Sequence, residues 1–275
     1  MFLLLSYFHI IFDDVTNVFL AVPEPVAFFP LNARYKATEK ENRQLRGILG
    51  DVAITNGPYN EPGGAYMFYG TVSSYIEFPT KEGLDTQFSI TLMCWVERRG
   101  EGGPLFSYGV SNLGVHMGIV EGKLSIGIVE RSSFNQLTGI KTPDVLPVGE
   151  WVHVAASYDH GTGNNSLYIN GHLRASQNIG RGYQIATNTQ KVRMGSKSCR
   201  DANFKGKIAE MKVYAVALNE TQIQTSIRQG SCTFPIIVVS LPSPMIPLII
   251  ETPVIEQPSK SQQIPFRIPF CKITT

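Results

Sequence analysis

The feature that most constrains the fold is a series of short segments in which apolar and polar residues alternate, separated by turns rich in glycine. In residues 151–158, one face carries four apolar side chains: Val152, Val154, Ala156 and Tyr158. Such alternation is typical of a β-strand with one buried face. Asn170-Gly171 joins two further segments and predicts a hairpin, because a type I′ turn needs positive φ at both central residues. Many short strands with glycine-rich turns and without alternating helices predict an all-β sandwich.

Glycine and proline divide the chain into regions. All 25 glycines lie between Gly47 and Gly230, whereas residues 233–275 hold eight of the 17 prolines. A single all-β domain of about 200–250 residues suits the 275-residue length. Residues 24–232 are therefore predicted to form this domain, and residues 233–275 a poorly ordered tail rich in proline and isoleucine.

The N-terminal segment is apolar but short. Residues 1–22 are predicted to be a signal peptide or leader, with an N-terminal strand as the alternative, although no Lys or Arg precedes Arg34. The apolar run, residues 2–12, is shorter than the ~20 residues that a membrane-spanning helix needs. We therefore expect a secreted, extracellular protein without a membrane-spanning segment.

The four cysteines are too few and too far apart for a disulfide scaffold or a zinc site. Cys94 lies on the apolar face of a strand-like segment that also carries Phe88, so a buried thiol is expected. Cys199 and Cys232 flank the last strand and the helix of the domain, and we predict that they form a disulfide. By closing this loop, the bond would lower the entropy of the unfolded chain and stabilise the fold by roughly 3–4 kcal/mol. Cys271 is left over.

One helix is expected near the end of the domain. Asn219 can cap it, and Gln222 follows at the spacing of a capping box. Ile223 and Ile227 share one face, and Gly230 is a stop signal. We expect a helix of about ten residues that covers an open end of the sandwich.

The ordered set of segments resembles a known family. The matching segments are residues 64–70, 74–78, 88–95, 151–159, 167–171 and 204–218. Together they resemble the laminin-G-like, concanavalin-A-like jelly-roll domain of extracellular proteins, particularly its pentraxin-related branch. The resemblance implies two antiparallel sheets packed face to face, and binding of glycans, proteins or other extracellular ligands. Related folds include glycoside hydrolases, so the fold alone does not give the function.

Signals for catalysis are weak. A glycosidase on this fold needs two carboxylates at a fixed separation, typically on a strand with the pattern Glu-x-Asp-x-x-Glu, which the sequence lacks. Glu77, Glu82 and Asp85 come nearest to such a set, and the last two lie in an expected turn. His153 follows Trp151 on the outer face of its strand, where a structural or exposed role is expected. The sequence predicts no enzyme.

Calcium is the cofactor to consider, because oxygen ligands on rim loops suit this ion. Many members of the family carry an Asp where this chain has Ala209, and this weakens the case for a transferred site. Turn residues could supply oxygen ligands, although forming turns is their ordinary role; they are Asp51, Asn56, Asp159 and Asn164. A calcium site therefore stays open, with no ligands assigned.

Two further sets of site residues are expected. A basic cluster, Lys197, Arg200, Lys205 and Lys207, is a candidate site for anionic ligands if the fold brings it together, and otherwise a solvated face. Asn164 and Asn219 begin sequons for N-glycosylation. Asn219 can serve as cap and glycan acceptor together, because the cap uses the side-chain oxygen and the glycan the nitrogen.

The function that these observations favour is a non-catalytic extracellular binding or adhesion module, which recognises a glycan or a matrix or cell-surface protein through rim loops. A calcium-dependent lectin, a glycan-processing enzyme and a purely structural spacer are the alternatives. The formal net charge of +2 argues against nucleic acid as a partner.

Overall fold

The structure, a computed structural model, describes residues 22–79, 84–109, 114–133, 136–188, 191–197 and 203–231. The predicted leader up to residue 21, the tail 233–275 and the predicted partners Cys199 and Cys232 lie outside these ranges. None of the helices in the described part combines the length and apolar character that crossing a membrane requires.

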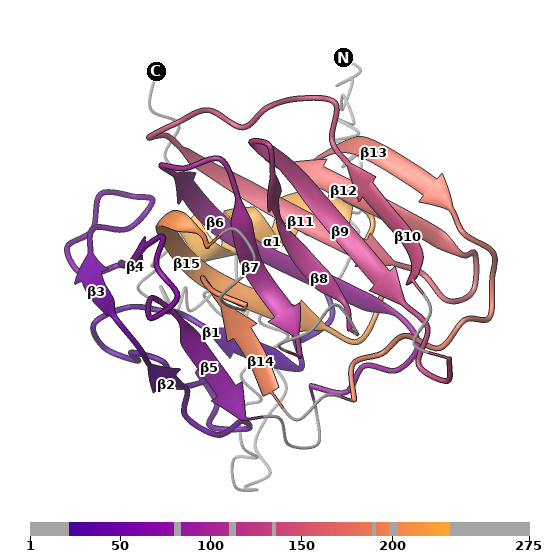
Figure 1. Cartoon of the computed structure of the whole chain (residues 1–275), viewed down its shortest axis with the longest axis horizontal. Helices are drawn as coiled ribbons and strands as arrows, with labels where there is room; N and C mark the ends of the chain where they lie inside the picture. The colour runs from indigo at the N-terminus through magenta and orange to yellow at the C-terminus, as the bar shows by residue number, and fades with distance from the viewer. Residues whose placement is uncertain are drawn as a thin grey trace, which may run out of the picture.

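The described strands form two antiparallel sheets packed face to face, as predicted (Figure 1). The first sheet has eight strands in the order β13-β12-β11-β6-β15-β4-β3, and β1 also pairs with β15. Its strands are β1 (Ala27–Phe29), β3 (Val52–Thr55), β4 (Ala65–Tyr69), β6 (Ile90–Arg98), β11 (Trp151–Tyr158), β12 (Asn164–Ile169), β13 (His172–Asn178) and β15 (Lys205–Tyr214).

The second sheet has seven strands in the order β10-β9-β8-β7-β14-β5-β2 and faces the viewer in Figure 1. Its strands are β2 (Ile48–Leu49), β5 (Ile76–Pro79), β7 (Gly103–Tyr108), β8 (His116–Val120), β9 (Lys123–Val129), β10 (Gln136–Lys141) and β14 (Lys191–Met194). Strands distant in sequence are neighbours in both sheets, because β14 pairs with β5 and β7, and β15 with β4 and β6.

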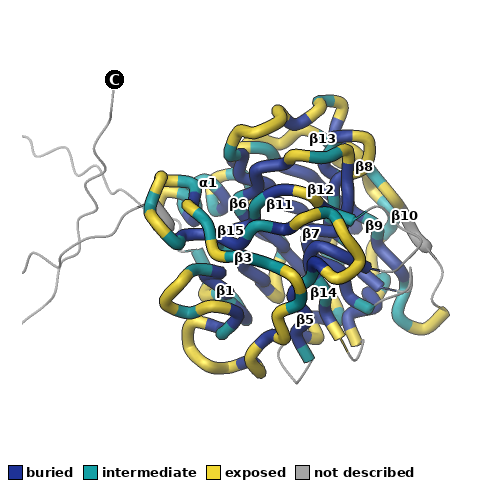
Figure 2. Tube along the Cα trace, turned by 60° about the vertical axis from the view of Figure 1, so that its left-hand side comes forward, coloured by how far each residue is buried: buried dark blue, intermediate teal, exposed yellow. Residues whose placement is uncertain are grey.

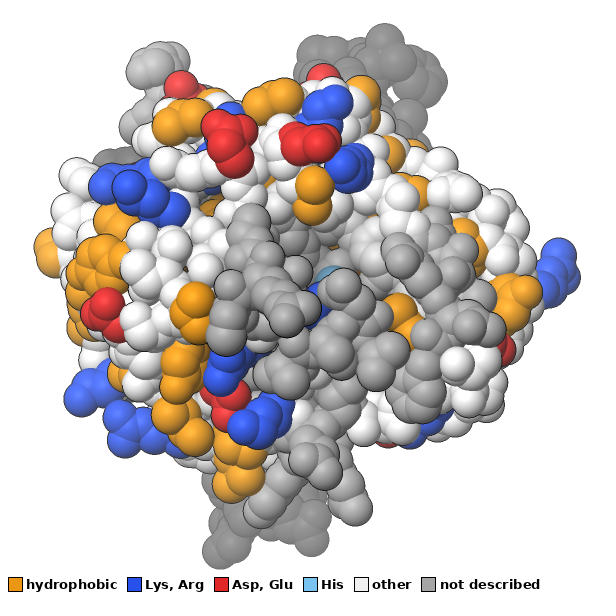
Figure 3. All heavy atoms as spheres, viewed as in Figure 1, with side chains coloured by type: hydrophobic (Ala, Val, Ile, Leu, Met, Phe, Trp, Pro, Cys, Tyr) orange, Lys and Arg blue, Asp and Glu red, His pale blue; other side chains and the backbone are white. Residues whose placement is uncertain are grey.

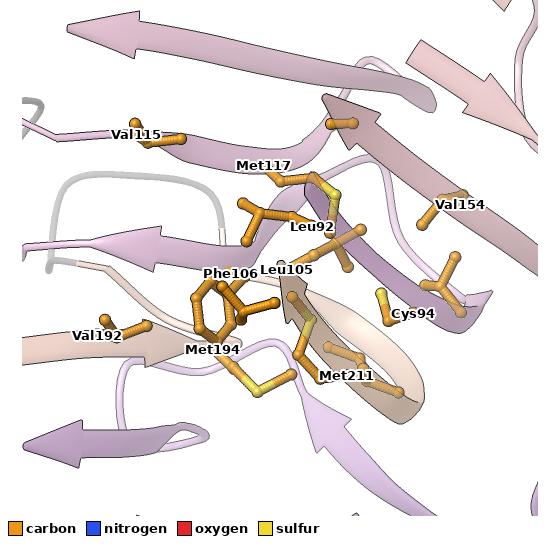
Figure 4. Close-up of a cluster of buried hydrophobic side chains, with 14 of the residues drawn as sticks. Leu92, Cys94, Leu105, Phe106, Val115, Met117, Val154, Val192, Met194 and Met211 are labelled. Atoms are coloured by element: carbon orange, nitrogen blue, oxygen red, sulfur yellow. The ribbon is translucent and has the colours of Figure 1, made fainter. Parts of the chain in front are cut away.

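The core lies between the two sheets, where the buried strands form the dark interior of Figure 2. Figure 4 shows Leu92 and Cys94 of the first sheet near Leu105 and Phe106 of the second. All four side chains are fully buried, so Cys94 is the core thiol that was expected. Burial also raises the pKa of the Cys94 thiol, which keeps it protonated and unreactive.

Two local predictions from the core pattern need correction. Phe88 was placed on the core face with Cys94, but it precedes β6 and the residue is 47% exposed. Simple alternation along residues 207–213 predicts Ala209 and Met211 on one face, but a β-bulge at Glu210, with φ of 51°, lies between them. The bulge puts Ala209 opposite the outward Trp95, whereas Met211 joins the core.

The hairpin and the capping box are confirmed. Asn170 and Gly171 both have positive φ, 51° and 80°, between β12 and β13. At the start of α1 (Glu220–Ser231), the Gln222 amide donates to Asn219 Oδ1 at 2.9 Å, and the Asn219 amide donates to Gln222 Oε1 at 3.0 Å. The helix has 12 residues and continues one residue beyond Gly230.

The helix α1 covers a face of the sandwich rather than an open end. Its Ile223 packs against Met93, Ala155 and Tyr214, which lie on the outer face of the first sheet. In Figure 1 the helix accordingly lies behind β6 and β11. The expected position was wrong because helix periodicity identifies an apolar stripe but not the surface that it meets.

Candidate binding groove

The outer face of the second sheet carries an open groove with a volume of about 470 Å³. Residues of β7, β8, β9 and β10 line it. Figure 3 views this face and shows a histidine side chain near its centre. The groove thus lies across neighbouring strands of a rigid sheet, on the side opposite the core.

Small residues form much of the groove floor. Gly118 of β8 pairs with Ser125 of β9, and Gly127 of β9 pairs with Gly139 of β10. These residues face outward because their neighbours in the strands, such as Ile126, point into the core. Glycine inside a strand often marks a place where a ligand or another backbone approaches closely.

A polar row crosses the floor next to these glycines. Ser107 of β7 pairs with His116 of β8, which in turn pairs with Gly127 of β9. Ser107 is 0% exposed, and its Oγ has no hydrogen-bond partner among the residues that the structure describes. A buried hydroxyl of this kind is uncommon in proteins and calls for a specific explanation, such as a bound water or ligand.

The charged side chains among the described residues that line the groove are both basic. Lys197 and Lys141 line it, and the described lining residues include no Asp or Glu. Lys141 Nζ lies 3.1 Å from Glu121 Oε2, in an exposed ion pair of the kind that contributes little energy. A concave site lined by one sign of charge raises the local concentration of ligands with the opposite sign.

The polar row continues beyond the groove to an ion-pair cluster. Arg193 of β14 pairs with Ser107 on one side and with Glu77 of β5 on the other. Glu77 Oε2 accepts from Arg193 Nη2 at 2.8 Å, and Glu77 Oε1 lies 3.0 Å from Lys191 Nζ. Burial favours a higher pKa for Glu77, but the hydrogen bonds from Lys191 and Arg193 outweigh it and lower the pKa. Glu77 is therefore ionised at neutral pH.

The structure does not gather the predicted basic cluster into one patch. Lys197 lies in the groove on the second sheet, whereas Lys205 and Lys207 lie on β15 of the first. Lys207 Nζ is 2.6 Å from Glu97 Oε2 and 5.6 Å from the centre of the Trp151 ring, so it belongs to a local ion pair. Arg200 lies outside the described residues.

Both predicted glycosylation sites are on the surface. Asn164 is exposed at the start of β12, and its Oδ1 accepts from Asn178 Nδ2 at 2.8 Å. Asn219 is exposed and forms the helix cap through Oδ1. These positions are compatible with glycans, and glycosylation of either residue stays a prediction.

A metal site remains unassigned. Within the described ranges, no group of three or more His, Cys, Asp or Glu side chains is placed to hold an ion. Asp159, one of the candidate oxygen ligands, stabilises its own turn instead. Its Oδ1 accepts from the Gly161 amide at 2.9 Å, and its Oδ2 from Thr162 Oγ1 at 2.8 Å.

The groove was not predicted from the sequence, although the strands that form its floor carry a recognisable pattern of small residues. In β8 and β9 the outward positions Gly118, Ser125 and Gly127 are small, where an exposed strand usually carries longer polar side chains. Ser107, His116 and Arg193 carried no comparable signal, because their proximity depends on pairing between distant strands.

Comparison with known proteins agrees with this architecture. Residues 70–224, more than half of the chain, match the family model of the concanavalin A-like lectin/glucanases superfamily. The chain belongs to this superfamily. No curated protein sequence matches the chain.

Several solved structures share the fold of this superfamily member. The binding domain of botulinum neurotoxin serotype G has a TM-score of 0.61 and 13% identity over 76% of this chain and 51% of its own. The binding domain of paraclostridial mosquitocidal protein 1 has a TM-score of 0.60 and 17% identity over 75% and 52%. This chain therefore spans about half of those two binding domains.

A third match extends over nearly a whole domain. Domain 4 of AbnA, a GH43 extracellular arabinanase from Geobacillus stearothermophilus, was solved in complex with arabinotriose. It has a TM-score of 0.55 and 19% identity over 74% of this chain and 97% of its own. Identities this low show a common fold, and the ligand must be argued from the groove itself.

Proposed function

We propose that this chain is a non-catalytic glycan-binding module and that the groove on the second sheet is its binding site. The observation that carries the proposal is an open groove on a sheet face, with a floor of small residues and a polar row at its centre. A floor of this kind lets a sugar approach the backbone closely, while Ser107, His116 and Ser125 supply groups that hydrogen-bond to hydroxyls.

The chemistry of the groove favours binding over hydrolysis. Glycoside hydrolysis requires an acid and a base or nucleophile, which are generally two carboxyl groups about 5–10 Å apart. Glu77 is on the same sheet face but two strands from Ser107, and Arg193 and Lys191 hold it ionised. An ionised carboxylate enclosed by two cations is a poor general acid.

The relatives support a binding role. One is the binding domain of a botulinum neurotoxin, another is the binding domain of a mosquitocidal protein, and the third is an arabinanase domain in complex with arabinotriose. The sequence had favoured recognition through rim loops by a glycan-binding or adhesion module. We place recognition on the sheet face instead, because the described groove lies there. Secretion, expected from the apolar N-terminal segment, is part of the same proposal.

The test is binding of the full chain to an array of neutral and acidic oligosaccharides, with calcium and then with a chelator. Ser125→Phe places a large side chain on the groove floor without touching the core, and should lower glycan binding by at least tenfold. Ser176→Phe is the matched control, because Ser176 is exposed on β13 of the other sheet. Binding that survives Ser125→Phe, or a chain that binds no glycan, would contradict the proposal.

The two calcium conditions separate this function from its main alternative. Binding through the groove alone should be equal with calcium and with chelator. Binding that is lost with chelator would identify a calcium-dependent lectin instead.

A further inference from the structure

We propose that Arg193 and Ser107 form a subsite for the carboxylate group of an acidic sugar, at the end of the groove nearest β14. This inference rests on the proposed glycan-binding function and adds the charge of the ligand to it. The two residues are register partners on β14 and β7, so their Cα atoms are about 5 Å apart on one sheet face.

Arg193 is held in a fixed orientation with donors to spare. Its Nε and Nη2 both donate to Glu77 Oε2, at 3.0 and 2.8 Å, and its guanidinium carbon is 4.1 Å from the centre of the Tyr75 ring. These contacts with described residues use Nε, Nη2 and the face of the guanidinium, and none of them uses Nη1. An arginine fixed by a carboxylate and stacked on a ring loses little further entropy when it binds a planar carboxylate.

Ser107 supplies the second, independent observation. Its hydroxyl is fully buried, lines the groove and has no partner among the described residues. A buried donor without an acceptor is unfavourable, and a ligand oxygen that accepts its hydrogen bond would remove that cost. Among ligand oxygens, an ionised one gives the strongest bond.

The surrounding charge favours an anion over a neutral sugar. The cluster of Arg193, Lys191 and Glu77 carries two positive charges and one negative charge. Lys197 adds a basic side chain to the groove wall, and the described lining residues include no carboxylate. Among these described residues, a ligand carboxylate beside Arg193 therefore meets more basic than acidic side chains, despite the presence of Glu77.

The experiment uses pairs of oligosaccharides that differ only in charge. The full chain is titrated with uronate- and sialate-bearing oligosaccharides as free acids, with the methyl ester of each, with sulfated oligosaccharides and with neutral ones. The free acids should bind on the order of tenfold more tightly than their esters, and the preference should weaken as salt is raised. A preference for sulfated over carboxylated sugars would overturn the assignment to a carboxylate.

Ser107→Ala is the most informative variant, because it removes a buried hydroxyl that has no partner and should not lower the thermal midpoint. It should weaken binding of the acids by about tenfold and leave the esters unchanged. Ser196→Ala is the matched control, since Ser196 is also fully buried with an unpartnered Oγ but is not among the described residues that line the groove. Arg193→Lys keeps the charge, removes the planar fork and should also lower the preference for acids.

The outcomes distinguish this inference from the proposed function. Equal binding of acids and esters, blocked by Ser125→Phe, would overturn the carboxylate subsite and retain the glycan groove. The same loss in Ser107→Ala and Ser196→Ala would also overturn the subsite. A chain that binds no sugar at all would overturn both.

Discussion

The two outer faces of the sandwich share one core but have opposite surroundings. On the first sheet, Met93, Ala155 and Tyr214 are covered by α1 through Ile223. On the second sheet, the outward positions around Gly118 and Ser125 stay open as a groove. The first face is therefore a second, smaller core, and the second face is available to a ligand.

Polar groups on the two faces differ in the same way. Under α1, Lys212 Nζ donates to Ser226 Oγ at 3.1 Å, and the Tyr214 hydroxyl lies 3.0 Å from that same oxygen. These groups anchor the helix to the sheet. In the groove, the Ser107 hydroxyl is buried without such a partner among the described residues. On the covered face the buried polar groups satisfy one another and anchor the helix, whereas the unsatisfied Ser107 hydroxyl lies in a groove that is open to a ligand.

The largest expected contrast is in stability. Ile223→Ala removes a fully buried side chain from the covered face, and should lower the free energy of unfolding by about 2–5 kcal/mol. Ser125→Ala changes the open face and should shift it by less than about 0.5 kcal/mol. Urea unfolding of both variants measures the difference. Similar losses from the two substitutions would show that the open face also supports the fold.

The covered face should also make the protein sensitive to acid. Burial, with a smaller contribution from the charge of Lys212, lowers the pKa of His153 to about 3. The unfolded chain, with a histidine pKa near 6.5, takes up a proton first, so stability falls as pH drops below about 6.5. Between pH 6.5 and 5 the loss should be about 2 kcal/mol.

His153→Gln is the control for this acid effect, because it removes the titrating group and should flatten the profile in that range. Chemical unfolding at several pH values gives the comparison. Glu77 and Asp85 have lowered pKa values and therefore contribute only at more acidic pH. Parallel profiles for the two proteins would show that His153 is not the source.

The smallest effect concerns the cap that begins α1. Asn219→Ala removes both the capping oxygen and the sequon, and should cost about 1 kcal/mol. Asn219→Ser removes the sequon but keeps a capping hydroxyl, so it should retain most of the stability. Thermal unfolding with mass analysis of secreted protein separates the two roles. A loss in the Ser variant equal to that in the Ala variant would assign the stability to a glycan.

Local features of the fold could be predicted because they depend on residues close in sequence. The turn at Asn170-Gly171 requires positive φ, and the Asn219–Gln222 box requires a spacing of three residues. The faces of β6 and β11 follow from alternation, apart from Phe88, which precedes the strand. Alternation gave the wrong faces on β15, because the bulge at Glu210 inserts one extra residue and the residues after it point to the opposite side of the sheet. The composition of the strand carries no sign of this insertion.

The candidate site could be predicted only in part. Lys197 was named as a basic candidate, but the structure separates it from Lys205 and Lys207 by placing them on different sheets. Ser107 and Arg193, 86 residues apart, meet because β7 pairs with β14. No local pattern specifies that pairing.

The sequence by itself determined the all-β class, the core faces of its long strands, the Asn-Gly hairpin and the capped helix, because each depends on dihedral preferences and periodicity within a few residues. Only the tertiary structure decided which outer face the helix covers and which one stays open. That choice depends on which strands pair and on which surface the apolar side of α1 can bury the most area, and both are properties of the assembled sheets. The groove, with Ser107 and Arg193 side by side, is a consequence of that assembly.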